Sequence, residues 1–213
     1  MLIQKNWLIF VCAMCAVVAA SNVLVQYPVM ATIGSFNLAD LLTWGAFTYP
    51  VAFLITDMTN RRFGPKAARM IVLSGFVLAV ALSIWLATPR IAVASGSAFL
   101  IAQLLDVSIF DRLRRASWWK APLISTVIGS VVDTAIFFSL AFSSTFAFGA
   151  PDAFATEMAP FLGAFALETP RWVSWAGGDL AVKLLVGVAM LLPYGLFLRS
   201  KLIGAEYQTH PQV

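Results

Sequence analysis

The sequence predicts an all-α integral membrane protein with six transmembrane helices, because of its composition, its long apolar runs and the placement of its basic residues. Of the 213 residues, 61% are hydrophobic and 11% are charged, and the mean hydropathy is +0.87. This balance leaves too few polar residues for a sizeable soluble domain. We therefore expect a single transmembrane domain over residues 1–213.

The spans follow from the apolar runs, because a helix needs roughly 20 mostly apolar residues to cross a bilayer core. The first run, from Trp7 to Val25, is uncharged, and the second lies between Asp40 and Asp57. The third ends at Pro89, where the chain turns tightly into the fourth, and the fifth and sixth carry charges among apolar residues. The predicted spans are residues 7–28, 39–57, 67–89, 90–110, 121–144 and 176–199.

Lysine and arginine are divided unequally between the two sides of these spans. Eleven fall on one side and two on the other. The eleven are Lys5, Arg61, Arg62, Lys66, Arg69, Arg112, Arg114, Arg115, Lys120, Arg199 and Lys201, and the two are Arg90 and Arg171. Cytoplasmic loops carry an excess of basic residues, so we expect both termini in the cytoplasm. The first run also resembles a cleaved signal peptide, but its apolar stretch is long enough to favour a retained helix.

The outer segment between the fifth and sixth spans, residues 150–168, is partly apolar. Phe154, Met158, Phe161 and Phe165 follow one another at helical spacing. This pattern predicts a helix lying in the outer membrane interface, bent at Pro160. The segment either covers an outward-facing cavity as a lid or only skims the membrane.

Polar and aromatic side chains inside the predicted spans mark a candidate binding site. A charge in hydrocarbon costs at least about 2.5–3.5 kcal/mol, so it usually belongs to a pathway or a ligand site. The candidates for substrate binding are Asn22, Gln26, Trp44, Phe47, Gln103, Asp106, Asp133, Asp179 and Lys183. Asn22 has the alternative role of a hydrogen bond between helices. Carboxylates, amides and aromatic rings together suit a flat, polar heterocycle with N–H donors, and they would also serve a cation or an amine.

The intramembrane charges differ in how readily a structural role explains them. Asp133 lies near mid-membrane without a basic neighbour on its own helix, so it needs a partner from another helix, water or a ligand, and it is the candidate for proton coupling. Asp179 and Lys183 are four residues apart on one helix face, so they form either a structural ion pair or part of the site. Asp57 has the simpler option of pairing with Arg61 at the cytoplasmic interface.

The sequence gives no sign of a metal site, a cofactor or a catalytic nucleophile. Cys12 and Cys15 have no other Cys as a partner, and the single histidine, His210, lies in the polar tail. These residues do not make up a zinc or redox site, and they exclude a Ser–His pair within the spans. A carboxylate dyad of Asp106 and Asp133 is the remaining option for catalysis, and we expect no enzyme activity.

Several segments resemble one family of membrane proteins. They are Ser21–Pro28, Thr43–Pro50, Phe53–Thr59, Phe63–Gly64, Arg90–Ala92, Gln103–Val107 with Phe110, Trp118–Trp119, Gly129–Thr134, and Lys183 with Pro193–Gly195. In order and spacing the chain resembles the queuosine precursor transporters, also called the YhhQ or VUT family, from about Ser21 to Gly195. The segment from Ala147 to Trp175 carries little of this resemblance.

The resemblance implies a bacterial inner-membrane importer of 7-cyano-7-deazaguanine and 7-aminomethyl-7-deazaguanine, which are salvaged for the queuosine modification of tRNA. It also implies a distant likeness to the substrate-binding components of energy-coupling-factor vitamin transporters. A substrate-binding subunit of a multi-component vitamin or nucleobase uptake system is therefore the alternative. Any energising subunit would be a separate protein, since the chain has no G-x-x-x-x-G-K-[ST] motif.

The expected partners are a small-molecule substrate and membrane lipid. The net charge of +4 does not indicate nucleic acid, because the basic residues cluster beside apolar runs as topology signals. The sequence leaves open a homodimer, the preferred precursor and the energy source.

Overall fold

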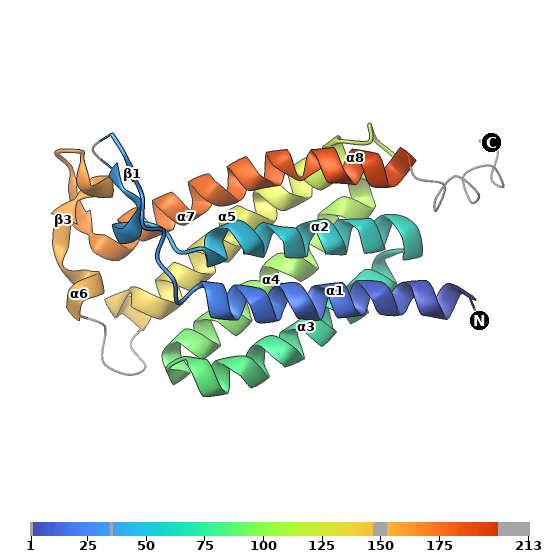
Figure 1. Ribbon diagram of the computed structural model, residues 1–213, viewed down its shortest axis with the longest axis horizontal. Helices are drawn as coiled ribbons and strands as arrows, with labels where there is room; N and C mark the ends of the chain where they lie inside the picture. Colours follow the sequence, from blue (N-terminus) through green and yellow to red (C-terminus); the bar gives the residue numbers. More distant parts are fainter. Residues whose placement is uncertain (1, 35, 147–152, 200–213) are drawn as a thin grey trace.

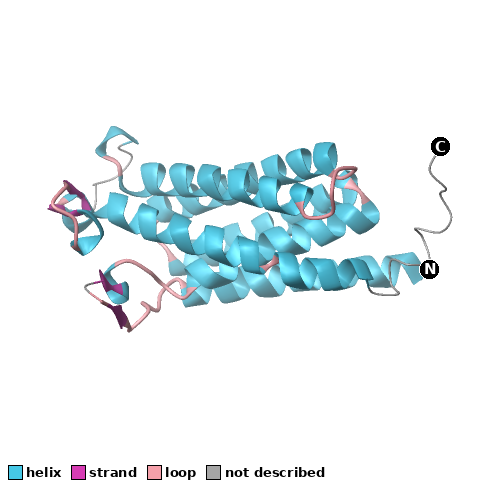
Figure 2. Cartoon of the chain, turned by 90° about the horizontal axis from the view of Figure 1, so that it is seen from above, coloured by secondary structure: helices cyan, strands magenta, loops and turns pink. Residues whose placement is uncertain are grey.

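Long helices that lie side by side form most of the described chain (Figures 1 and 2). The computed structural model describes residues 2–34, 36–146 and 153–199. The long helices are α1 (Leu2–Leu24), α2 (Gly45–Phe63), α3 (Pro65–Leu86), α4 (Pro89–Leu113), α5 (Lys120–Phe142) and α7 (Arg171–Ala189), which α8 (Leu191–Arg199) continues. The start of α1 and the end of α8 lie at one end of the bundle, which we call the terminal end (Figure 1).

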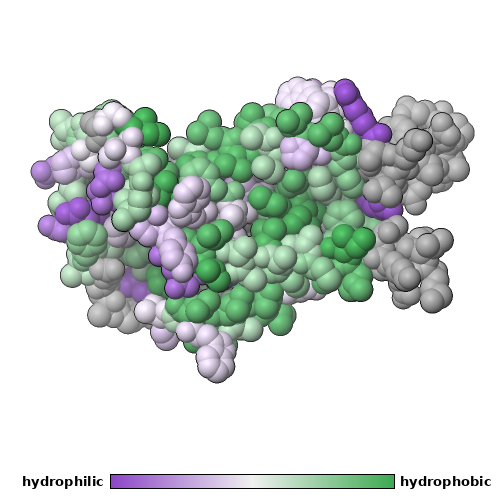
Figure 3. Space-filling view, in the orientation of Figure 1, coloured by the Kyte–Doolittle hydropathy of each residue, from purple (hydrophilic) through white to green (hydrophobic). Residues whose placement is uncertain are grey.

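The structure confirms an all-α fold suited to a membrane. Within the described residues, five helical stretches are long and apolar enough to cross a bilayer: Trp7–Leu24, Pro65–Leu86, Pro89–Leu113, Lys120–Phe142 and Arg171–Arg199. Figure 3 shows apolar side chains over the middle of one face, with hydrophilic residues mainly toward the ends. This distribution is typical of a bundle surrounded by lipid.

The helix α2 stands apart from these five because it is more polar. Asp57, Arg61 and Arg62 lie in its second half. It nevertheless packs inside the bundle, against α1, α3, α4 and α7. Its polar side chains are therefore covered by other helices, and they form much of the site described below.

Proline and glycine set the turns between consecutive helices. Gly64 ends α2 with a φ of 83°, a left-handed backbone that glycine adopts without strain, and Pro65 begins α3. Pro89 likewise begins α4, while the hydroxyl of Thr88 accepts a hydrogen bond from the Ile91 amide over 3.4 Å. These short connections make α2, α3 and α4 run side by side.

The last predicted span is two helices in the structure. It begins at Arg171, right after Pro170, and is interrupted at Met190 between α7 and α8. Pro193 explains the interruption, because proline has no N–H to donate to the carbonyl one turn earlier. The first helix also differs in its bounds, since α1 ends at Leu24 rather than at residue 28.

Short hairpins cover the end of the bundle opposite the terminal end (Figure 1). One pairs β1 (Thr32–Ile33) with β2 (Phe36–Asn37), and η1 (Leu38–Asp40) follows it. The other pairs β3 (Met158–Pro160) with β4 (Glu168–Pro170). The short helices η2 (Ser144–Phe146) and α6 (Ala153–Thr156) precede it, and η3 (Phe161–Gly163) lies in the loop between its strands. Both hairpins belong to the connections between helices.

The predicted interfacial helix over the outer segment is therefore wrong. Its described part, residues 153–168, contains one helical turn followed by a hairpin, and residues 150–152 lie outside the described residues. Pro160 and the left-handed Gly163, with a φ of 73°, interrupt any continuous helix. The helical spacing of three phenylalanines and one methionine was therefore weaker evidence for the local structure than Pro160 and Gly163.

Candidate functional site

The centre of the bundle holds a buried group of charges from two helices. The Nζ atom of Lys183, on α7, lies 2.7 Å from Oδ2 of Asp133 on α5 and 2.5 Å from Oδ2 of Asp179, one turn earlier on α7. The lysine also donates to the hydroxyl of Thr134 over 3.3 Å. All three donors of the ammonium group thus have acceptors.

Two hydroxyl groups complete the hydrogen bonds of the carboxylates. Tyr49, on α2, donates to Oδ1 of Asp133 over 3.0 Å, and Thr134 donates to Oδ2 of Asp179 over 2.8 Å. The Lys183 ammonium lies 5.2 Å from the centre of the Tyr49 ring. We call Tyr49, Asp133, Thr134, Asp179 and Lys183 the central cluster.

The central cluster is shielded from the surroundings and carries an excess negative charge. The side chains of Lys183 and Asp133 are 5% and 4% exposed, and that of Asp179 is 16% exposed. Two carboxylates against one ammonium leave a formal charge of −1. Such a group is costly to bury unless each charge is paired, so the three residues depend on one another.

Local helix geometry explains the contact between Asp179 and Lys183 but not the contact between Lys183 and Asp133. Asp179 and Lys183 are four residues apart, so they share a face of α7. Asp133 and Thr134 are adjacent on α5, and α5 packs against α7. The structure thereby supplies the interhelical partner that Asp133 needed, and it joins three of the residues predicted from the sequence.

A second polar group connects α2 to α4, closer to the terminal end. The hydroxyl of Thr56 donates to Oε1 of Gln103 over 2.7 Å, and the amide of Asn60 donates to the carbonyl of Val107 over 3.0 Å. Between these two contacts, the carboxyl groups of Asp57 and Asp106 lie within hydrogen-bond reach of each other. We call these three contacts, spread over about one helical turn, the polar ladder.

The polar ladder is fully buried but not fully hydrogen-bonded. Asp57 is 1% exposed, and Asp106 and Gln103 are 0% exposed. Ser125, on α5, lies beside both carboxyl groups and donates to Oδ1 of Asp57 over 3.4 Å. Among the described residues, no donor of good geometry reaches either oxygen of Asp106, and Nε2 of Gln103 and Oδ1 of Asn60 also lack partners. Buried polar atoms are usually paired, so these atoms need an explanation.

Arg61 does not pair with Asp57, in contrast to the simpler option read from the sequence. Its guanidinium donates through Nε to the hydroxyl of Tyr194 over 2.9 Å and through Nη1 to the carbonyl of Arg114 over 2.6 Å. Arg114 in turn donates to the Arg61 carbonyl over 3.4 Å. These contacts tie α2, α8 and the end of α4 together at the terminal end.

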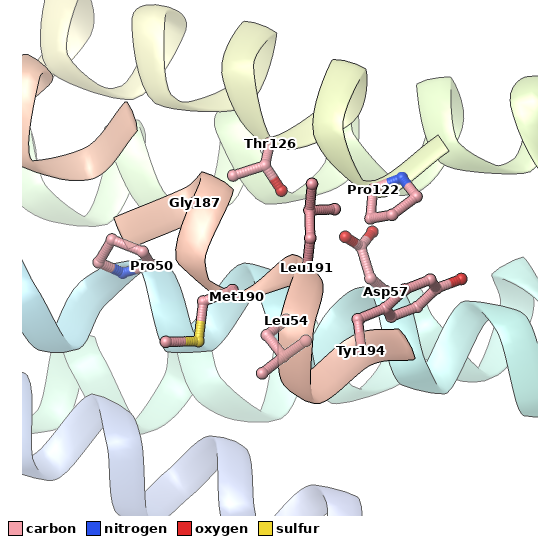
Figure 4. Close-up of a pocket in the computed structure, with 9 residues that line it drawn as sticks. All are labelled: Pro50, Leu54, Asp57, Pro122, Thr126, Gly187, Met190, Leu191 and Tyr194. Atoms are coloured by element: carbon pink, nitrogen blue, oxygen red, sulfur yellow. The ribbon is translucent and has the colours of Figure 1, made fainter. Parts of the chain in front are cut away.

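A small cavity lies beside Asp57, between α2, α5 and the α7–α8 break. It has about 230 Å³ of empty space, its mouth included. The lining residues are Pro50, Leu54, Asp57, Pro122, Thr126, Gly187, Met190, Leu191 and Tyr194 (Figure 4). Figure 4 shows the carboxyl group of Asp57 directed toward Pro122 of α5. The cavity thus gives the polar ladder a route toward space outside the packed core.

The remaining predicted residues lie away from both polar groups, near the hairpin end of α1 and α2. Asn22 donates to the carbonyl of Val18 on its own helix over 2.9 Å, and the exposed Gln26 donates to the Asn22 carbonyl over 3.2 Å. Trp44 is 48% exposed, and its ring centre lies 5.7 Å from that of Phe47. The structure therefore does not bring these four residues into the central cluster.

Sequence reasoning missed Thr134 as a site residue and left Tyr49 out of the candidates. Both carry a hydroxyl inside a predicted span, which was the available signal. Their role depends on which helix faces which, and the spacing within one helix does not contain that information. The same applies to the Arg61–Tyr194 contact, which joins positions 133 residues apart.

A bundle of membrane-spanning helices with charges buried at its centre defines a class of protein: a multi-pass membrane protein built for transport. The chain matches the family described as "Putative vitamin uptake transporter" over residues 43–88 and 81–197. It therefore belongs to this family of transporters.

Curated relatives agree with this assignment. The chain is 36% identical to the "Queuosine precursor transporter" of Escherichia coli over 87% of its own length and 83% of the relative. It is 34% identical to the "Probable queuosine precursor transporter" of Haemophilus influenzae, over 85% of this chain and 82% of the relative. A "Probable queuosine precursor transporter" of Bacillus subtilis is 28% identical over 57% of the chain. No solved structure matches, so the likeness to energy-coupling-factor components stays a prediction.

Proposed function

We propose that this chain imports queuosine precursors of the 7-deazaguanine type across the bacterial inner membrane. The observation that carries the proposal is the central cluster, where two carboxylates and a lysine are buried between α2, α5 and α7. The names of the relatives, at 34–36% identity over most of the chain, supply the substrate class.

The chemistry of the central cluster suits the polar edge of such a base. That edge presents a ring N–H and an exocyclic amine beside a carbonyl oxygen. A carboxylate accepts two parallel N–H bonds, and an ammonium donates to a carbonyl. We assign the N–H groups to Asp133 or Asp179 and the carbonyl to Lys183, with the ring of Tyr49 as the stacking surface.

Substrate binding must then replace contacts within the protein. In the described structure Lys183 already donates to both carboxylates, and Tyr49 donates to Asp133. The incoming base offers equivalent donors and an acceptor, so the exchange leaves no buried charge unpaired.

Four of the remaining predicted residues fit an entry path. Asn22, Gln26, Trp44 and Phe47 lie near the hairpin end, where Trp44 is half exposed. We propose that they make the first contacts with a base arriving from the outside. Gln103 and Asp106 belong to the polar ladder, farther along the bundle toward the terminal end.

The proposed topology counts α2 as a sixth span, with both termini in the cytoplasm. Two observations support it. The helix α2 runs within the bundle (Figure 1), and its polar residues face other helices instead of lipid. Arg61, Arg62, Arg112 and Arg115 lie toward the terminal end of α2 and α4, as the positive-inside rule requires of a cytoplasmic side.

The test is uptake in a bacterium that lacks both precursor synthesis and its own importer. The cells receive 7-cyano-7-deazaguanine with or without this gene, and queuosine is measured in their tRNA. We expect queuosine only in cells that express the protein. No queuosine in cells with well-expressed protein in the membrane would contradict the proposal.

A second arm separates a self-sufficient carrier from a subunit that needs a partner. The purified chain alone, in liposomes, should exchange labelled for unlabelled 7-cyano-7-deazaguanine. If exchange requires a co-purifying ATPase, the alternative of a substrate-binding subunit takes its place.

A further inference from the structure

The contact between Asp57 and Asp106 in the polar ladder has no role in the substrate site proposed above. The two residues come from α2 and α4, are 1% and 0% exposed, and place their carboxyl groups within hydrogen-bond reach of each other. Tyr49, in the central cluster, lies eight residues before Asp57 on α2, or about 12 Å along the helix. The two acids thus form a separate site.

No cation in the described residues neutralises this pair by direct contact. The charged or titratable groups near it are Arg61 on α2, Arg114 just after α4, and Tyr194 on α8, while α5 contributes the neutral Ser125. The hydrogen bonds of the Arg61 side chain go to Tyr194 and to the Arg114 carbonyl, not to a carboxylate. The central cluster differs, because there Lys183 contacts both acids.

Two buried carboxylates in contact cannot both stay ionised, since like charges repel and neither is hydrated. An ionised carboxylate only accepts hydrogen bonds, whereas a protonated one donates. A single proton shared between the two groups therefore turns a repulsive contact into a hydrogen bond. Carboxyl pairs that share one proton are a recurring solution to this problem.

Buried polar atoms without partners, near the carboxyl pair, are consistent with a site that holds a proton or a water molecule. Nε2 of Gln103 has no acceptor among the described residues, although Gln103 is 0% exposed and lies one turn from Asp106 on α4. Oε1 of the same amide is held by Thr56, the neighbour of Asp57, so the amide lies at the level of the carboxyl pair. Oγ of Ser130 on α5, between Ser125 and Asp133 in sequence, is also buried and has no partner in the part of the chain that the structure describes. A water molecule can hydrogen-bond to both atoms, since the amide donates and the hydroxyl donates or accepts.

The cavity supplies the access that a proton site requires. Asp57 lines it together with Thr126 and Tyr194, and the break between α7 and α8 forms one wall. Most of its empty space belongs to the open mouth, and the enclosed part has room for about one water molecule but not for a bicyclic base. The pair is thus buried within the helices yet adjacent to a space that can exchange protons with solvent.

We propose that Asp57 and Asp106 form a proton-binding site, and that loading and unloading of this proton drives substrate accumulation. The coupling part rests on the proposed function. Loading breaks one O–H bond of a hydronium ion from the outer side and forms an O–H bond on one carboxylate oxygen. Unloading breaks that bond and passes the proton to water in the cavity, which lies toward the terminal end, once the two carboxyl groups move apart. This assigns proton coupling to the pair instead of to Asp133, which Lys183 keeps as a paired carboxylate.

The first test detects the proton without any substrate. Infrared spectra of the purified protein in lipid should show the C=O band of a protonated carboxyl group at a pH where ordinary aspartates are ionised. We expect the band to disappear in the double variant Asp57→Asn with Asp106→Asn, and to remain in the matched control Glu168→Gln, which removes an exposed carboxylate on β4. Absence of the band in the unmodified protein, or its survival in the double variant, would overturn the proton site.

The second test concerns coupling and uses the purified protein in liposomes with 7-cyano-7-deazaguanine, which is uncharged. With the outside of the liposomes more acidic than the inside by about one pH unit, the probe should accumulate about tenfold inside if one proton accompanies each molecule. Asp57→Asn should still exchange labelled for unlabelled probe, but the concentration of probe inside the liposomes should not rise above the concentration outside. Circular dichroism and gel filtration of each variant would confirm that it is folded.

The outcomes separate the two proposals. Accumulation by Asp57→Asn equal to that of the unmodified protein, or accumulation driven by a sodium gradient alone, would overturn proton coupling at this pair. No exchange of the probe by the unmodified protein would instead count against the proposed function, and the infrared result would still decide whether the pair holds a proton.

Discussion

Lys183 on α7 donates to Asp133 on α5 with 2.7 Å between Nζ and Oδ2, and this contact joins positions 50 residues apart. The same ammonium lies 2.5 Å from Asp179 on its own helix. Lys183 is thus the shared counterion of two buried acids, and removing it affects both.

The first prediction is that Lys183→Met strongly reduces the amount of folded protein. Methionine has a similar length but leaves Asp133 and Asp179 buried without a counterion, which costs about 3–5 kcal/mol. The measurement is the thermal midpoint in detergent, followed by gel filtration. The matched control is Arg171→Met, which removes the basic partner of Glu157 in an exposed ion pair and should cost no more than about 1 kcal/mol.

Neutralising both acids should restore folding but not transport. In the triple variant Lys183→Met, Asp133→Asn, Asp179→Asn, no buried charge is unpaired, so the thermal midpoint should recover most of the loss. Uptake should stay absent, because the groups proposed to bind the base are gone. A triple variant that transports normally would remove the central cluster from the substrate site.

The second prediction is that exchanging the two charges on α7 destabilises the protein. An isolated pair of Asp179 and Lys183 would tolerate Asp179→Lys combined with Lys183→Asp. In this structure Lys183→Asp places a carboxylate against Asp133, so two like charges meet in a buried site. The double variant should therefore be less stable than the unmodified protein. Expression and melting equal to the unmodified protein would argue against the observed contact with Asp133.

Asp179 and Lys183 were predictable as neighbours because a four-residue spacing on a helix fixes their relation within one element. The partner of Asp133 was not, because it depends on how α5 and α7 rotate against each other. The same limit explains the missed contacts of Tyr49 with Asp133 and of Arg61 with Tyr194. Each of these contacts joins two helices that are distant in sequence.

The all-α membrane fold could be predicted because apolar runs of span length leave few alternatives. The outer segment was predicted wrongly because four apolar residues at helical spacing are weak evidence beside Pro160 and Gly163. The helix α2 shows the opposite case. Its polar residues make it less apolar than the five clear spans, and only packing shows that other helices cover them.

The third prediction concerns the hydroxyl of Tyr49. Tyr49→Phe keeps the ring but removes the donor to Oδ1 of Asp133, and a hydrogen bond to a charged group contributes about 1.5–3 kcal/mol. We expect a lower thermal midpoint, and an affinity for 7-cyano-7-deazaguanine that is lower by roughly tenfold or more. Tyr27→Phe is the control, since Tyr27 is 58% exposed in the loop after α1. Equal effects of the two substitutions would show that the Tyr49 hydroxyl has no special role.

The fourth prediction tests the topology with reporter fusions. A reporter placed after Arg62 or Arg115, at the terminal ends of α2 and α4, should be cytoplasmic. A reporter inserted near Phe165, between η3 and β4, should be periplasmic. A cytoplasmic result near Phe165 would contradict the odd number of spans that the proposed topology places between this position and each cytoplasmic terminus.

The fifth prediction uses the close approach of α2 and α5 at Gly129. A Cβ atom at this position would lie 2.7 Å from Cε1 of Phe53 and 3.2 Å from its Cζ, and Phe53 is fully buried. Because the ring is fully buried, we expect Gly129→Ala to push the two helices apart, at about 1–3 kcal/mol. Gly96→Ala on α4 is the matched control, since its Cβ would meet Phe76 at an ordinary 3.4 Å. We expect a lower thermal midpoint for Gly129→Ala and an unchanged or higher one for Gly96→Ala, because alanine favours helix more than glycine does. A displacement of α2 would also move Tyr49 relative to Asp133, so uptake by Gly129→Ala should fall further than its stability alone explains. Unchanged melting and uptake would mean that Phe53 is not held as tightly as the structure has it.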